Sequence, residues 1–171
     1  MGTKPIYERG KSMKAYIVTL FGHRELNAHT EVEKRLYSIV QDLIRSKEYV
    51  EFYIGRDGEF DVFSASIIKR AQKALGSENS EIILVLPYKR RNIEFYEQYY
   101  NSVLIPDSIS HVHPKQAITK RNRWMVEKCD LFICYAEHKT GGTSKALQYT
   151  RKLGKNIINL AIDRDTFHPP F

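Results

Sequence analysis

Two adjacent glycines precede two hydroxyl side chains at Gly141, Gly142, Thr143 and Ser144, between an apolar segment and an amphipathic one. Glycine lets a backbone approach a ligand closely. The start of a helix offers unpaired N–H groups and the positive end of its dipole, which suits a phosphate. The segment therefore predicts a phosphate-binding turn; the alternative is a tight turn in which Thr143 is only the N-cap. It matches neither a P-loop nor GxGxxG.

Polar residues also follow the earlier apolar segments. In parallel α/β sheets ligands bind outside the carboxyl ends of the strands, so these residues are further binding candidates. They are Gly22, His23 and Arg24 after the first segment, and Gly55, Arg56, Asp57, Gly58, Glu59 and Asp61 after the second. Carboxylates there can accept ribose hydroxyls or act in N-glycosidic chemistry, which makes Glu59 and Asp61 the catalytic candidates. The alternative is that they cap the following helix.

A polar residue interrupts an apolar stripe in the segment 115–128. On a helical wheel Asn122 falls in line with Ile118 and Met125, which predicts a buried amide. A buried amide must be hydrogen-bonded, so Asn122 either ties loops together or faces a ligand. Arg121 and Arg123 flank it. We count Arg121 among the binding candidates; the alternative is a solvated basic face.

The chain alternates between short apolar runs and amphipathic stretches. Strands are predicted at 15–21, 50–54, 82–86, 103–105, 131–135 and 156–160, and helices at 60–75, 92–100, 115–128 and 143–153, with a further helix starting at a capping box of Thr30 and Glu33. This order predicts one Rossmann-like α/β domain over 14–161, with a mostly parallel sheet and helices on both faces. Residues 1–13 are predicted to be a flexible leader and 162–171 a tail. Strand order is not encoded in the pattern.

Composition narrows the class of protein. The 171 residues carry a net charge of +7, with 42% hydrophobic and 27% charged residues, as is common for a globular domain. No apolar run is long enough to span a membrane, and residues 1–12 are polar and lack the apolar core typical of a signal peptide, so we expect a cytoplasmic protein. Cys129 and Cys134 are expected to be buried, reduced and structural. The histidines lack zinc-site spacing, so no metal is predicted. No cofactor is predicted either.

Together these segments resemble the SLOG superfamily, which contains DprA (Smf) and the LOG phosphoribohydrolases, and most closely its small YpsA-like bacterial members. The likeness covers roughly residues 14–161. It rests on Gly22 to Arg24, Gly55 to Asp61, Arg121 to Val126 leading to Asp130, and Gly141 to Thr143 followed by Ala146, Tyr149, Gly154 and Lys155. The resemblance implies a Rossmann-like fold that binds nucleotides or their derivatives. LOG enzymes cleave base from ribose 5-phosphate, but their signature places an acid after the threonine, and none follows Thr143 here.

The leading expectation is therefore a sensor or binding module for a nucleotide-derived, phosphate-bearing molecule. An N-glycosidic hydrolase or transferase is the first alternative, and single-stranded nucleic-acid binding is the second. We also expect a homodimer, because residues 93–100 carry four aromatic side chains, and tyrosine is enriched at interfaces. The alternative is that these side chains pack on the sheet or line the ligand cleft. They are Phe95, Tyr96, Tyr99 and Tyr100.

Overall fold

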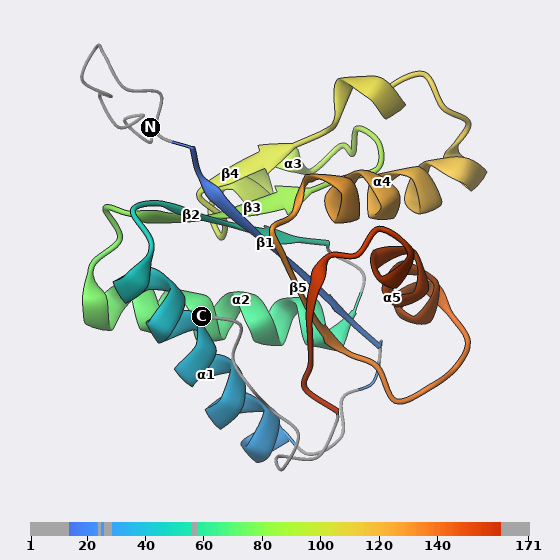
Figure 1. Ribbon diagram of the computed structural model, residues 1–171. Coiled ribbons are helices and arrows are strands. Elements are labelled where there is room, and N and C mark those ends of the chain that lie inside the picture. The colour runs from blue at the N-terminus through green and yellow to red at the C-terminus, as the bar shows by residue number, and fades with distance from the viewer. Residues whose placement is uncertain (1–13, 24, 26–28, 56–57, 162–171) are drawn as a thin grey trace.

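Six strands lie side by side in one parallel sheet with the order β4-β3-β2-β1-β5-β6. The computed structural model describes residues 14–23, 25, 29–55 and 58–161 (Figure 1). The strands are β1 (Tyr16–Gly22), β2 (Val50–Ile54), β3 (Ser80–Val85), β4 (Ser102–Leu104), β5 (Leu131–Tyr135) and β6 (Asn156–Asn159). The predicted α/β class is confirmed, and every pairing between neighbouring strands is parallel. The leader and the tail lie outside the described residues.

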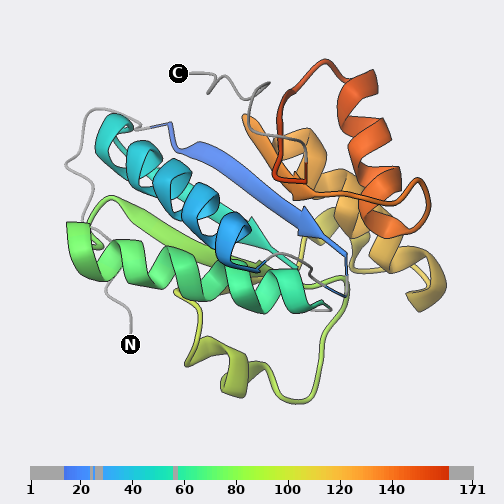
Figure 2. The same cartoon turned by 90° about the horizontal axis from the view of Figure 1, so that it is seen from below.

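Helices cover both faces of this sheet, as Figures 1 and 2 show. One face carries α1 (His29–Ser46) and α2 (Glu59–Leu75), and the other carries α4 (Pro114–Lys128) and α5 (Gly142–Lys152). The short helix α3 (Ile93–Glu97) precedes the edge strand β4. A 3-10 turn, η1 (Asp107–Ile109), was not predicted. The helices therefore form a layer on each side of the sheet, as the alternating pattern indicates.

The central strand β1 is packed on both sides, which explains its continuous apolar sequence. Val18 and Leu20 belong to the core cluster beneath α1 and α2, whereas Phe21 belongs to the second cluster beneath α4 and α5. Its ring stacks on Phe132 of β5, with ring centroids 5.2 Å apart. Cys134 lies in the same second cluster and is fully buried, as predicted, and burial raises the pKa of its thiol to about 12. This core holds β1 and β5 in fixed register.

The direction of chain winding reverses at β1. From β1 the chain adds β2, β3 and β4 on one side, and then returns to place β5 on the opposite side of β1. The helices α1 and α2, which precede this return, lie on one face of the sheet, and α4 and α5, on either side of β5 in the sequence, lie on the other (Figure 2). Loops that leave the carboxyl ends of β1 and β5 therefore diverge, and ligands of open α/β sheets bind in the crevice between such loops.

Helix boundaries differ from the sequence expectation at two hydroxyl residues. The capping box of Thr30 and Glu33 is wrong, because α1 already begins at His29 and Thr30 lies within its first turn. Likewise α5 begins at Gly142, so Thr143 is a helical residue and not the N-cap. In the described part of the chain, no helix is both long and apolar enough to cross a membrane.

Candidate ligand-binding site

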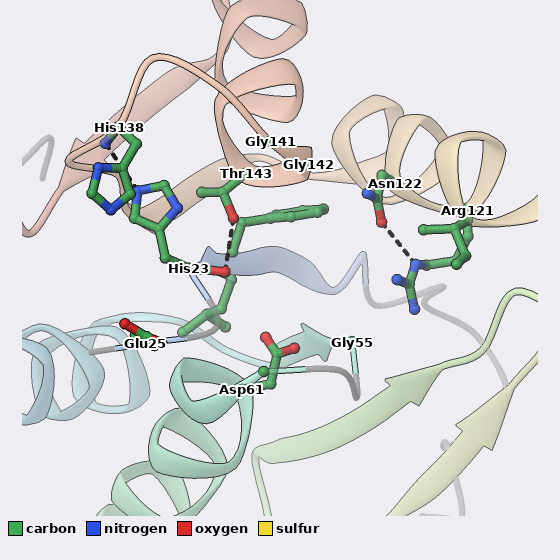
Figure 3. A pocket seen from close by; sticks show the side chains of 15 residues that line it. His23, Glu25, Gly55, Asp61, Arg121, Asn122, His138, Gly141, Gly142 and Thr143 are labelled. Carbon is green, nitrogen blue, oxygen red and sulfur yellow. Dashed lines mark hydrogen bonds between the residues drawn. The ribbon is translucent and has the colours of Figure 1, made fainter.

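A pocket of about 540 Å³ opens at the carboxyl ends of the central strands, where the loops that follow β1 and β5 diverge (Figure 3). It is built from the end of β1, the residue after β2, the start of α2, the middle of α4 and the start of α5. The lining residues are Leu20, Phe21, Gly22, His23, Glu25, Gly55, Gly58, Asp61, Ile118, Arg121, Asn122, His138, Gly141, Gly142 and Thr143. The pocket thus lies at the switch point of the sheet, where a Rossmann-like fold places its ligand.

The start of α5 forms one wall of this pocket. Gly141 is the N-cap, with φ 95° and ψ 178°, a conformation that is essentially restricted to glycine. Gly142 and Thr143 follow as the first helical residues, whose N–H groups have no acceptor within the helix. The Thr143 hydroxyl donates a 2.7 Å hydrogen bond to the Gly22 carbonyl. The wall therefore presents backbone donors and the positive end of a helix dipole, and its threonine ties α5 to β1.

An adjoining wall, formed by α4, contains a buried arginine. Arg121 is only 5% exposed, and its Nη1 donates to the Val85 carbonyl at 2.9 Å. Its Nε donates to Asn122 Oδ1 at 2.8 Å (Figure 3). A Cβ atom built on Gly55 would lie 3.3 Å from Arg121 Nη1, so glycine there leaves room for the guanidinium. Arg121 is thus a fixed positive charge at the pocket wall, held by backbone and amide oxygens.

The predicted helical stripe around Asn122 is wrong in detail. The buried face of α4 contains Ala117, Arg121 and Met125, each four residues apart, while Ile118 is 42% exposed at the pocket mouth. The buried polar residue is therefore Arg121, and Asn122 is half-buried beside it. The second interpretation of Arg121, a solvated basic residue, is also wrong. Met125 of the predicted stripe is buried as expected, and the contacts of the guanidinium with Val85 and Gly55 accompany the burial of Arg121.

Two histidines meet at a third side of the pocket. The Nε2 atom of His23 accepts hydrogen bonds from the backbone N–H groups of Glu137 at 2.8 Å and His138 at 3.1 Å. The rings of His23 and His138 lie 4.5 Å apart. Burial and the nearby His138 lower the pKa of His23, whereas Glu137 opposes this shift. A neutral His23 that accepts at Nε2 therefore fastens the loop after β1 to the loop after β5.

The two catalytic candidates are separated by the structure. Asp61 lies at the start of α2 and its carboxylate points into the pocket (Figure 3). Glu59 is on the exposed side of the same helix turn, where its Oε1 lies 3.3 Å from His29 Nε2, and it does not line the pocket. A second pocket carboxylate comes from Glu25. Of the two predicted acids, only Asp61 is placed to meet a ligand.

Most of the other predicted site residues converge on this pocket. Gly22, His23, Gly55, Gly58, Arg121, Asn122, Gly141, Gly142 and Thr143 all line it. Ser144 is buried behind the wall and does not line it. Arg24, Arg56 and Asp57 lie outside the described residues. Sequence reasoning did not select Glu25 and His138 as site residues, although both stand in the segments that follow β1 and β5, and that position is the signal that identifies them.

Comparison with known proteins supports the fold. No family model matches the chain, and no curated protein matches it. Among solved structures, DNA processing protein A (DprA) from Streptococcus pneumoniae superimposes with a TM-score of 0.60 at 14% identity, covering 84% of this chain and 49% of that one. The chain shares the fold of DprA. An identity of 14% shows a shared fold alone, so the resemblance to the SLOG superfamily and to its YpsA-like members stays a prediction.

Two further structures extend this comparison. DprA from Helicobacter pylori gives a TM-score of 0.55 at 14% identity, covering 83% of this chain and 63% of that one. The molybdenum cofactor carrier protein of Chlamydomonas reinhardtii gives 0.54 at 11% identity, covering 89% and 80%. The chain thus spans about half to two-thirds of the DprA chains it matches. Sequence identities this low show a shared fold, whereas function has to be argued from the residues of the site.

Proposed function

We propose that the pocket binds a nucleotide or a nucleotide-derived molecule through its phosphate, and that the protein acts as a sensor or binding module. The observation that carries this proposal is the pairing of two anion-binding features across one pocket. The start of α5 at Gly142 forms one wall and the buried Arg121 forms another. A helix start and an arginine are both favourable partners of a phosphate.

The rest of the pocket suits the remainder of a nucleotide. A volume of about 540 Å³ is within the range of small-molecule sites. Leu20, Phe21 and Ile118 supply apolar surface, and the carboxylate of Asp61 is a natural acceptor for ribose hydroxyls. Partners for a phosphate, an acceptor for sugar hydroxyls and an apolar surface for a base are therefore all present in one pocket, as the three chemical parts of a nucleotide require.

A ligand panel tests this proposal. AMP, ADP, ATP, ADP-ribose and NAD are added at millimolar concentration and the melting temperature is measured. A ligand present at about 100 times its Kd stabilises a protein by about 2.7 kcal/mol, which for this chain length is roughly 5–10 °C. We expect at least one panel member to give such a shift, and Arg121→Lys to reduce it. No shift from any member would contradict the proposal.

A second candidate function is cleavage of the N-glycosidic bond, favoured by Asp61 in the pocket. If it operates, the wild type releases free base from a nucleoside or nucleotide and Asp61→Asn abolishes the release while ligand binding persists. Glu59→Gln is the matched control, since Glu59 is paired with His29 away from the pocket and its loss should leave turnover unchanged. Absence of turnover across purine and pyrimidine substrates supports a binding module instead.

A third candidate follows from the neighbours. The Helicobacter pylori DprA structure is described as giving insight into a single-stranded DNA binding mode, and this chain carries a net charge of +7. Binding through phosphate contacts weakens steeply with salt. We expect only weak association with single strands, lost at physiological salt. Submicromolar affinity for an oligonucleotide at 150 mM salt would make nucleic-acid binding the primary function.

A further inference from the structure

A second hollow of about 340 Å³ lies between α4 and α5, beside the main pocket. Its walls are the polar faces of the two helices. On α4, one wall is formed by Thr119, Asn122 and Arg123. Lys145, Tyr149 and Lys152, spaced by three or four residues on α5, provide the other. We call this hollow the α4–α5 groove.

The groove is strongly cationic. Arg123, Lys145 and Lys152 all line it, and no aspartate or glutamate is among the described residues that do so. Both lysines are exposed, so each can turn toward an anion. Lys145 also stands in the first turns of α5, which carry no acidic residue, and a cation near a helix start is unfavourable unless an anion offsets it. The charges thus favour a negatively charged occupant.

One of these cations is held in place. The Arg123 guanidinium lies 5.2 Å from the centroid of the Tyr149 ring. The Tyr149 hydroxyl in turn donates a 2.6 Å hydrogen bond to Glu127 Oε1. Cation–π contact with a ring that is itself fixed limits the freedom of the arginine. An arginine already restrained loses less entropy when it binds a phosphate.

The groove adjoins the main pocket. Asn122 and Gly142 line both, and a Cβ atom on Gly142 would lie 3.9 Å from Asn122 Nδ2. Figure 3 shows Asn122 on α4 and Gly142 at the start of α5. Asn122 and Gly142 therefore form the shared boundary of the two hollows, and a ligand whose first phosphate meets the start of α5 would reach the groove by passing over this boundary.

We propose that the α4–α5 groove is a second subsite that takes the further phosphates of the same ligand, so that the protein prefers a nucleoside polyphosphate to a monophosphate. The assignment rests on the proposed function of the main pocket. A small polyphosphate fits the observations better than a nucleic-acid strand, because the groove is short and the single ring that lines it, Tyr149, is occupied by Arg123. A sequence-independent strand site typically has several aromatic stacking platforms.

Calorimetric titration with AMP, ADP and ATP, and with GMP, GDP and GTP, tests the assignment at 150 mM salt in EDTA. Charge-assisted contacts are each worth enough for about tenfold in affinity, so we expect the triphosphate of the preferred base to bind at least about tenfold more tightly than the monophosphate. In Lys145→Gln/Lys152→Gln this ratio should fall below about threefold while monophosphate affinity is kept. Lys120→Gln, an exposed lysine on α4 outside both hollows, should keep the wild-type ratio.

The outcomes separate the two proposals. Equal affinity for mono-, di- and triphosphates overturns the subsite and leaves the main pocket standing. Binding of no nucleotide overturns both. An oligothymidylate that binds more tightly than any triphosphate, and loses affinity in the double lysine variant, would assign the groove to a nucleic-acid strand and overturn the polyphosphate assignment. Arg123→Gln gives an independent variant, expected to reduce the same ratio.

Discussion

The hydroxyl of Thr143 lies 2.7 Å from the carbonyl oxygen of Gly22 and donates a hydrogen bond to it. These residues are far apart in the sequence, at the start of α5 and at the end of β1. The bond therefore fixes the distance between the two elements that frame the pocket. Since Thr143 is 7% exposed, water cannot readily replace it as the donor.

Loss of this hydroxyl should weaken both the fold and the site. We expect Thr143→Val to lower the free energy of unfolding by about 1–2 kcal/mol, because the half-buried Gly22 carbonyl loses its donor. Urea denaturation measures this change. Thr143→Ser keeps the hydroxyl and should remain within about 1 kcal/mol of wild type. Equal stability of the valine and serine variants would show that the hydrogen bond contributes nothing.

The two glycines at the start of α5 should behave differently. Gly141→Ala is expected to cost about 1–3 kcal/mol of stability, because φ 95° strains any residue with a side chain. Gly142→Ala should leave stability unchanged or slightly higher, since its Cβ meets only Asn122 at 3.9 Å. That methyl group nevertheless occupies the pocket wall, so ligand affinity should fall about tenfold. Melting and calorimetry on both variants separate fold from function, and undiminished affinity in Gly142→Ala would remove this wall from the site.

Acidification should loosen the pocket through His23. Burial, followed by the neighbouring His138, lowers the pKa of His23 below its ordinary value of 6.5, and the folded state therefore favours the neutral ring. Its contribution to stability is complete above about pH 6.5 and is lost as the pH falls through the lowered folded pKa. We expect His23→Gln, whose amide oxygen can accept the same N–H groups, to lose less stability than wild type between pH 7.5 and 5.0.

The same substitution at His111, an exposed histidine away from the pocket, is the control for this pH effect. His111→Gln should follow the wild-type profile, measured as melting temperature against pH. A wild-type profile in His23→Gln would mean that another group carries the pH dependence.

The aromatic surface of α3 is expected to mediate self-association. No residue of α3 is buried, and Phe95 on α3 and Tyr99 just after it are 54% and 49% exposed, with their rings 5.2 Å apart. The four aromatic side chains do not line the cleft, and only Tyr100 packs against the core. A second copy of the 20.0 kDa chain is the partner we expect.

Light scattering at tens of micromolar protein measures this association. We expect a mass about twice that of one chain for the wild type, and a single-chain mass for Phe95→Glu/Tyr99→Glu with an unchanged melting curve. Leu153→Glu, an exposed apolar residue after α5, should leave the dimer intact. A single-chain mass for the wild type would contradict the dimer, and a dimer in the double variant would place the interface elsewhere.

The elements of the fold were readable because hydrophobic periodicity is local. Runs such as those of β2 and β5 were predicted with their observed bounds. Strand order depends on pairings between distant segments, such as Thr19 with Phe132, and no local pattern encodes it. The residues that follow the strands were predicted to lie together at one site, because parallel strands end at the same edge of the sheet.

The errors concern residues whose roles are set by tertiary packing. The side chains of Arg121 and Asn122 point about 100° apart around the axis of α4. Arg121 is the one that contacts Val85 and Gly55, which come from distant parts of the sequence, so a local pattern does not show that it is buried. The sequence does not distinguish Glu59 from Asp61 as candidate acids. In the structure Glu59 lies beside His29, whereas Asp61 lines the pocket. The α4–α5 groove requires two helices to be placed side by side, so no single segment predicts it.

The central claim is that a phosphate-bearing nucleotide occupies the pocket between the start of α5 and Arg121. Titration of the uniformly ¹⁵N-labelled protein with the best ligand of the panel, followed by backbone amide NMR, tests it most directly. We predict that the largest chemical-shift changes occur at the amides of Gly22, Gly55, Gly142 and Thr143. In Arg121→Lys the ligand should bind more weakly, and the same amides should shift. Shifts confined to other surfaces, or no shift at millimolar ligand, would contradict the claim.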